Sequence, residues 1–378
     1  MLEVDVRLAG KHSASPRSRA IMRRTLSRMR QLLRYPAMAM RHRWLAAVVI
    51  LTACTSTVSR TPTSTSVTAS VSKSPPLTAS PIGSPLPIGR PIDVASLRGQ
   101  VVFSNETQDI WVARADGSDA HRITAAPAQE FDPTWSPDGS QIAYRHQTGD
   151  DETTEIFVMD ADGSAQRNLT RDHVADWGPD WSPNGRWIAW NSAVGTGGFG
   201  FFGYAIRPDG SGVRRITDHY VEYPAWSPDG LKIAFMAQEA GAAGDNPDYN
   251  IFVMDADGSN VRRLTDAPGE DGWPAWSPDG ARIVFASARD DCTVSDAPDC
   301  LSTGDIGPWI DVWMMSANGS HLRRVTTEYG QFFAWSPDGR EIMVAGGSSL
   351  YVIRPDGSGR SNVPVRGVPH PLFPDWIA

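Results

Sequence analysis

The chain has 378 residues, of which 40% are hydrophobic and 21% charged, enough for one large folded domain or two ordinary ones. Its net charge of −8 is unevenly distributed: residues 1–95 carry 14 Lys and Arg against 3 acidic residues, whereas residues 96–378 carry 21 against 40. A globular part this acidic is a poor candidate for binding nucleic acid, and the lack of an apolar run of ~20 residues excludes a polytopic membrane protein.

The first 54 residues combine a basic stretch with a short apolar segment. We interpret residues 1–39 as a basic N-terminal extension that results from a translation start placed too far upstream, with Met22, Met29, Met38 or Met40 as the true start. The alternative is a basic amphipathic helix on a membrane or nucleic acid. Residues 40–54 contain a positive cluster, an apolar run of ten residues and the ending Leu-Thr-Ala-Cys. This segment resembles the signal peptide and lipobox of bacterial lipoproteins, which implies that Cys54 is diacylated and becomes the new N-terminus. A plain secretory signal is the alternative.

Residues 55–95 are predicted to form a disordered, flexible linker. Of these 41 residues, 16 are Ser or Thr and 7 are Pro, a composition that cannot bury a core. The sequence therefore predicts a folded part at 96–378 that lies outside the cytoplasm and is held away from a membrane by this linker.

Residues 96–378 repeat one unit six times. WSPDG occurs four times and WSPNG once, and a last Trp near the C-terminus occupies the same place, so the repeat Trp residues are Trp135, Trp181, Trp226, Trp276, Trp335 and Trp376. Their spacing of 41 to 59 residues is typical of the four-stranded blade of a β-propeller. Each unit has four short apolar stretches, and Asp-Gly or Asn-Gly turns between them are a strong hairpin signal because Gly accepts a positive φ.

The number of stretches predicts a closed ring. The first unit lacks a Trp strand of its own, whereas the segment around Trp376 stands alone at the C-terminus. The predicted fold class is therefore all-β, a six-bladed β-propeller of four-stranded antiparallel blades in which N- and C-terminal strands together complete one blade.

The consensus PxWSPDGxxIAF…IFVMDADGSNxRRLT resembles the repeat of TolB-type β-propellers over essentially all of 96–378. This resemblance implies a six-bladed, extracytoplasmic propeller of a kind that mostly serves as a protein-binding platform. The fold alone does not define a function, because one fold carries many.

The repeat Trp residues and two of the cysteines are expected to have structural roles. The repeat Trp residues occur once per blade in one register, so we expect them to pack between neighbouring sheets. Cys292 and Cys300 lie in a long insertion of the fifth unit. Outside the cytoplasm, so closely spaced a pair is predicted to form a disulfide.

The connections before each Trp strand are predicted to form the mouth of the central channel, on the face that carries the long insertions. The residues expected there are mostly acidic or aromatic: Glu130, Asp176, Trp177, Glu222, Asp271, Trp273, Gln331 and His370. Such a mouth suits a basic protein segment or a cationic ligand. A hydrated mouth without a ligand and a bound divalent cation are the alternatives.

The predicted function is that of a non-catalytic platform that binds a protein or peptide of the bacterial cell envelope. We expect a lipid-anchored monomer that faces the periplasm or the cell exterior and uses no metal or cofactor. Neither GxSxG nor HExxH is present. The alternative is a carbohydrate-active or other propeller hydrolase or lyase that uses mouth carboxylates such as Glu130 and Asp176 as acid and base.

Overall fold

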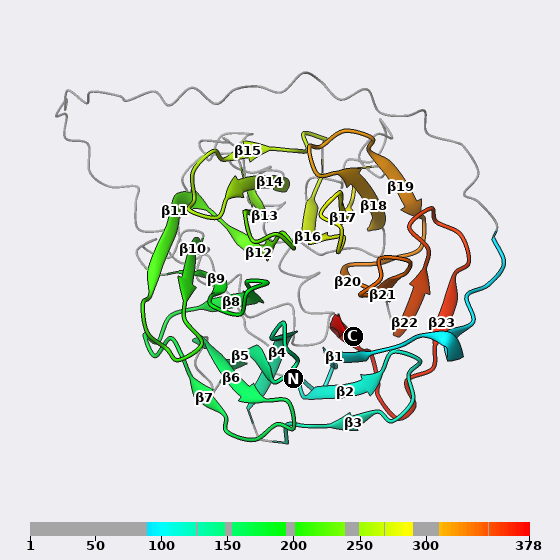
Figure 1. Ribbon diagram of the computed structural model, residues 1–378, viewed down its shortest axis with the longest axis horizontal. Helices are drawn as coiled ribbons and strands as arrows, with labels where there is room; N and C mark the ends of the chain where they lie inside the picture. The colour runs from blue at the N-terminus through cyan, green and yellow to red at the C-terminus, as the bar shows by residue number, and fades with distance from the viewer. Residues whose placement is uncertain are drawn as a thin grey trace, which may run out of the picture. The chain divides into compact units, whose positions relative to one another are not determined.

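A computed structural model describes residues 89–125, 128–147, 153–193, 201–238, 249–267, 269–289, 310–346 and 348–378. In these ranges, twenty-four strands form six four-stranded antiparallel sheets that surround a common axis (Figure 1). The predicted extension (1–39), signal peptide (40–54) and most of the predicted linker lie outside the described residues.

From the innermost strand outward, the first three sheets consist of β24 (Leu372–Ile377), β1 (Gln100–Ser104), β2 (Ile110–Arg114) and β3 (His121–Arg122); β4 (Gln129–Trp135), β5 (Gln141–Gln147), β6 (Thr154–Asp160) and β7 (Arg167–Asn168); and β8 (Asp176–Trp181), β9 (Ile188–Ser192), β10 (Phe202–Ile206) and β11 (Arg214–Tyr220). The other three consist of β12 (Glu222–Trp226), β13 (Lys232–Gln238), β14 (Tyr249–Asp255) and β15 (Arg262–Arg263); β16 (Asp271–Trp276), β17 (Arg282–Ser287), β18 (Asp311–Ser316) and β19 (Arg323–Thr326); and β20 (Phe332–Trp335), β21 (Ile342–Gly346), β22 (Ser349–Ile353) and β23 (Ser361–Val363).

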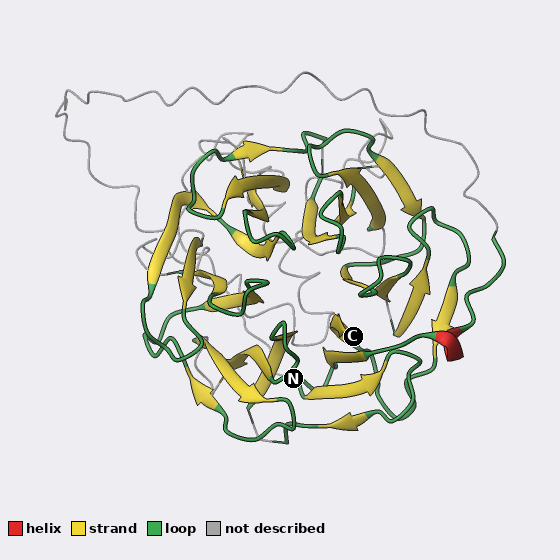
Figure 2. Ribbon diagram, viewed as in Figure 1, coloured by secondary structure: helices red, strands yellow, loops and turns green. Residues whose placement is uncertain are grey.

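The two ends of the propeller meet in the first sheet. The C-terminal strand β24 pairs with β1, so that Trp376 lies opposite Val101. A short 3-10 helix (Val94–Ser96) precedes β1. The ring of sheets in Figure 2 confirms the predicted fold class and the predicted closure. In the part of the chain described above, no helix has the length and apolar character that crossing a membrane requires.

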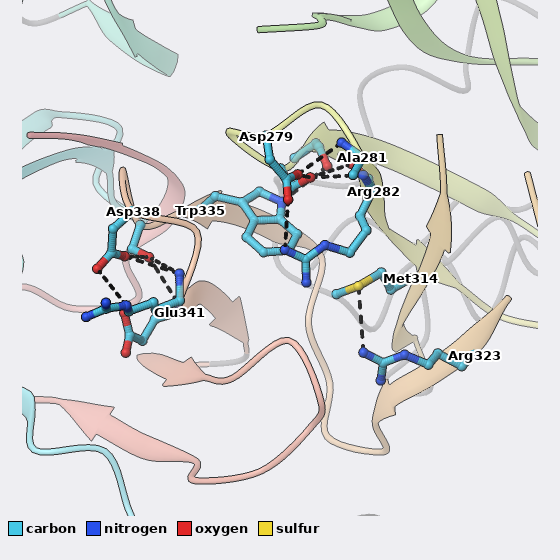
Figure 3. A network of polar contacts seen from close by, with 12 residues as sticks. Asp279, Ala281, Arg282, Met314, Arg323, Trp335, Asp338 and Glu341 are labelled. Carbon is cyan, nitrogen blue, oxygen red and sulfur yellow. Dashed lines mark hydrogen bonds and ion pairs between the residues drawn. The ribbon is translucent and has the colours of Figure 1, made fainter. Parts of the chain in front are cut away.

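The turn after each of the first five repeat Trp residues is held by its own side chains. In the fifth sheet, Ser277 Oγ donates to Asp279 Oδ1 at 2.5 Å, and Ala281 N donates to the same oxygen at 3.0 Å. Figure 3 shows this carboxylate between the backbone of Ala281 and the guanidinium group of Arg282. These hydrogen bonds hold the pKa of Asp279 below its usual value. Gly280 then takes a φ of 67°, a conformation that costs Gly little.

The hydrophobic core lies between neighbouring sheets. Trp335 of β20 packs in one buried cluster with Val284 of β17 and Ile342 of β21, which joins the fifth and sixth sheets. Its Nε1 donates to the backbone oxygen of Ala275 in the fifth sheet at 3.3 Å. The other five repeat Trp residues also belong to such clusters or pack against them. The expected packing of these residues between sheets is therefore confirmed.

Candidate functional site

Five of the six innermost strands contain a β-bulge three residues before the repeat Trp. At this position the backbone φ is between 46° and 57° in Asp132, Gly178, Tyr223, Trp273 and Phe373. The pairing with the second strand shifts at the same place in these five sheets. In the sixth sheet, β20 pairs with β21 in unbroken register from Phe332 to Trp335. A bulge bends its strand and re-aims a side chain, here around the propeller axis.

The innermost strands enclose a cavity of about 350 Å³ on the propeller axis. Its wall is formed by the bulge positions and the residues that follow them on β4, β8, β12, β16, β20 and β24. Pro228, Pro278 and Pro337, which belong to the turns after the repeat Trp residues, also line it. The cavity therefore extends from the level of the bulges toward the face that carries the WSPDG turns.

One side of the cavity is a continuous aromatic wall. The ring centroids of Tyr223 and Trp273 are 5.9 Å apart, those of Trp273 and Phe332 5.8 Å, and those of Phe332 and Phe373 3.7 Å. These residues occupy equivalent places in the fourth, fifth, sixth and first sheets. Aromatic faces carry a negative quadrupole that attracts a cation.

The other side of the cavity carries three carboxylates, Asp132, Asp180 and Asp375. Asp180 Oδ2 accepts a hydrogen bond from Trp226 N at 2.6 Å, and Asp375 Oδ2 accepts one from Trp135 N at 2.7 Å. Each of these two carboxylates thereby ties its sheet to the next one. The described residues that line the cavity include no Lys or Arg, so its charge is negative whenever these groups ionise.

Burial raises the pKa of all three cavity carboxyl groups. The pKa of Asp180 rises to about 7, because burial disfavours its charge and the Asp375 carboxylate repels it. Burial also raises the pKa of Asp375. Asp132 is affected in the same way, although Arg145 Nε lies 3.2 Å from its Oδ2 and opposes the shift. A cation that enters the cavity would favour the ionised forms.

The structure places three of the predicted mouth acids inside the blades. Glu130, Asp176 and Asp271 are at most 1% exposed. Thr124 Oγ1 donates to Glu130 Oε2 at 3.2 Å, and Arg289 Nη2 pairs with Asp271 Oδ2 at 2.8 Å.

The bulge explains this placement. The cavity wall on β4 begins at the bulge position Asp132, and Glu130 lies two residues before it. The pairing of β4 with β5 shifts between Phe131 and Thr134, and before this shift Glu130 lies opposite His146, whose Nδ1 is 3.4 Å from its Oε1.

The remaining predicted mouth residues are distributed around the ring. Trp273 lines the cavity. Trp177 packs on Phe201, with the ring centroids 4.7 Å apart. Tyr249 Oη donates to Glu222 Oε1 at 2.8 Å, and burial raises the pKa of Glu222 to about 7.

Gln331 and His370 also have local partners. Gln331 Oε1 accepts a hydrogen bond from Tyr329 Oη at 2.9 Å, and His370 Nε2 lies 3.4 Å from Glu106 Oε2. Partner binding by the predicted mouth residues stays a prediction. Cys54, Cys292 and Cys300 lie outside the described residues, so their predicted lipidation and disulfide also stay predictions.

Sequence reasoning did not single out the other side chains that define the cavity: Asp132, Asp180, Asp375, Tyr223, Phe332 and Phe373. They lie one and three residues before the repeat Trp, around the recurring Pro of the PxW motif. Aligning the six units on this Trp would have shown acids at these positions in three units and aromatic residues in four.

The comparisons with known proteins agree with this architecture. The family model described as the TolB beta propeller domain, PD40, matches residues 100–245 and 218–293, together more than half of the 378 residues. No curated protein matches the chain.

Three solved structures illustrate the similarity. TolB from Acinetobacter baumannii is 19% identical with a TM-score of 0.59, and the match covers 74% of this chain and 66% of that one. A putative TolB from Agrobacterium tumefaciens is 18% identical with a TM-score of 0.53, covering 75% and 99%. Hydrazine synthase from Kuenenia stuttgartiensis is 15% identical with a TM-score of 0.58, covering 78% and 50%. At these identities the similarity concerns the fold alone.

Proposed function

Since the chain belongs to the PD40 family of TolB β-propeller domains, we propose that it acts as a non-catalytic binding platform of the bacterial cell envelope. Its ligand is a basic segment of a protein or peptide, which places a Lys or Arg side chain in the axial cavity. The lipid anchor at Cys54 and the linker at 55–95 hold the propeller at the membrane, facing the periplasm or the cell exterior.

The observation that carries this proposal is the pairing of an aromatic wall with three carboxylates in one cavity. A guanidinium or ammonium group held over Trp273 gains a cation–π interaction, and Asp180 and Asp375 line the same cavity from β8 and β24, each two strands away around the ring. Burial disfavours the ionised forms of both acids, and a cation that binds beside them stabilises these forms.

The volume of the cavity limits the size of its ligand. At about 350 Å³ it lies at the lower end of the range for small-molecule sites, roughly 300–1,000 Å³. It accommodates one or two side chains rather than a folded domain. An extended, basic chain segment therefore fits better than a globular surface.

The experiment is a binding titration of the full chain with fluorescein-labelled hexapeptides. One series contains Arg or Lys beside an aromatic residue, and the matched series has Glu in place of the basic residue. We expect saturable binding of the basic series only, weakened about tenfold or more when Asp180 and Asp375 are both changed to Asn, because a desolvated charge pair is lost.

The control variant is Asp218→Asn, which removes an exposed acid of β11 outside the cavity and should leave binding unchanged. Equal binding of the basic and acidic peptides, or equal affinity in the native chain and the double variant, would contradict the proposal. Turnover of an oligosaccharide that is lost in Glu130→Gln or Asp176→Asn would instead support the hydrolase or lyase alternative.

A further inference from the structure

A second group of carboxylates lies away from the axial cavity, where the second and third sheets meet. Glu155 is on β6, Asp172 is on the connection between the two sheets, and Asp176 begins β8. One carboxylate oxygen of each lies within 4.8 Å of the others. We propose that these three residues form a binding site for a divalent cation, Ca²⁺.

The side chain of Asp176 carries the proposal. It is fully buried, and neither of its carboxylate oxygens has a hydrogen-bond partner of good geometry among the described residues. The side chains of Ser192, Thr170 and Trp190 interact with this carboxylate, but they are neutral and bring no positive charge. An ionised carboxylate buried without such a partner is costly, and two further carboxylates beside it increase the cost. A bound cation supplies the positive charge that this arrangement lacks.

The equivalent positions of two other sheets show what a buried acid requires here. Glu130 and Asp271 also lie five residues before their repeat Trp. His146 Nδ1 lies 3.4 Å from Glu130, and Arg289 Nη2 lies 2.8 Å from Asp271. Beside Asp176 lie two further acids, Glu155 and Asp172, and not a basic side chain. In the described part of the chain, the one basic side chain paired with the group is the exposed His173, whose Nδ1 is 3.6 Å from Glu155 Oε1.

The geometry of the group is fixed before any cation binds. Glu155 accepts hydrogen bonds from Thr170 Oγ1 at 2.6 Å and from His173 N at 2.8 Å. The backbone of Asp176 is tied to Thr154, whose Oγ1 donates to the Asp176 carbonyl oxygen at 2.9 Å. The Glu155 carboxylate and the backbone of Asp176 are therefore held in place, which reduces the ordering cost of binding.

The three carboxylates favour a hard cation, and the exposed one among them opens the group to solvent. Three carboxylates supply only oxygen ligands, which Ca²⁺ prefers, and waters complete its coordination. Asp172 is exposed, whereas Glu155 and Asp176 are buried. A hydrated ion can therefore reach the group from solvent through Asp172.

Calorimetric titration of the metal-free full chain with CaCl₂ tests this site, with thermal melting as a second readout. We expect one Ca²⁺ per chain, with a dissociation constant on the order of 10⁻³ M or tighter, as in extracellular calcium modules. Ca²⁺ should raise the melting temperature of the native chain. Asp176→Asn and Asp172→Asn should each weaken binding by about tenfold or more and remove the calcium-dependent part of that rise.

Two variants keep the test decisive. Asp218→Asn is the control, because it removes an exposed acid of β11 that is not part of the group and should bind Ca²⁺ like the native chain. Asp172 is exposed, so Asp172→Asn reports on the site even if Asp176→Asn perturbs folding. A native chain that shows no saturable Ca²⁺ binding overturns the proposal. Equal Ca²⁺ affinity in the native chain and in Asp172→Asn does so as well.

Discussion

At the level of single residues, the buried carboxylates of this propeller differ in what compensates their charge. Asp271 has an arginine, and Asp375 accepts two hydrogen bonds, from Trp135 N and Thr134 Oγ1. Asp180 accepts one backbone hydrogen bond and faces the Asp375 carboxylate. Asp176, Asp180 and Glu222 have no cationic partner among the described residues, and burial raises the pKa of each to about 7. Such uncompensated acids are expected where binding groups are kept at a cost in stability.

The raised pKa of Asp180 predicts how stability changes with pH. In the folded chain this pKa is about 7, against 3.8 for an unperturbed group, so between these values the folded state binds more protons than the unfolded state. The contribution of Asp180 to stability therefore falls as pH rises from about 4 to 7. Asp180→Asn keeps an oxygen for Trp226 N but cannot ionise.

We expect the Asp180→Asn chain to gain melting temperature relative to the native chain as pH rises from 5 to 8. Melting curves of both chains across this range measure the difference, with Asp218→Asn as the exposed control. A difference that stays constant with pH would show that Asp180 titrates near its ordinary value.

At the level of the strand, the sequence predicted the hairpins but not the bulges. Trp spacing, WSPDG turns and Asp-Gly turns are local patterns, and they suffice for six blades and their closure. A bulge depends on register between two strands, which no single stretch of sequence displays. Glu130 was expected at the mouth because it precedes the PxW motif, whereas in the structure it lies within β4 and pairs with His146 of β5. The acids and aromatic residues that line the axial cavity are visible in the aligned repeats, but that they line one cavity depends on how the six inner strands come together around the axis.

In the Asp-Gly turn of the fourth sheet, replacing Gly258 by Ala is expected to disrupt the contact with the third sheet. Gly258 has a φ of 89°, and a Cβ built on it would lie 1.8 Å from the backbone oxygen of Ile216 in the third sheet. Gly185 has a φ of 67°, but its nearest neighbour would be 4.0 Å away. Gly185→Ala should therefore lose only the unfolding free energy that a positive φ costs a residue other than Gly, about 1–3 kcal/mol. Gly258→Ala also forces the turn away from β11.

Chemical denaturation measures both variants against the native chain. We expect Gly258→Ala to lose clearly more unfolding free energy than Gly185→Ala. Equal losses would mean that the two sheets separate at this turn without cost.

At the level of the whole ring, stability depends on the seven C-terminal residues. β24 pairs with β1, and Trp376 is buried in a cluster with Phe332 and Val352 of the sixth sheet. Removing residues 372–378 exposes the inner edge of β1 and opens the core on that side. The loss of Trp376 alone is worth about 3–5 kcal/mol, a large part of the roughly 5–15 kcal/mol that stabilises a typical domain.

We therefore expect the chain that ends at residue 371 to melt at a markedly lower temperature, whereas removal of the exposed Ala378 alone has little effect. A synthetic peptide of residues 368–378, added in excess, should restore most of the lost melting temperature, because the vacated edge of β1 offers the backbone groups that the peptide strand needs. Restoration should fail with a peptide in which Trp376 is replaced by Ser. If the shortened chain instead melts like the native chain, five complete sheets and a three-stranded one hold the ring without closure, and the pairing of β24 with β1 contributes little to stability.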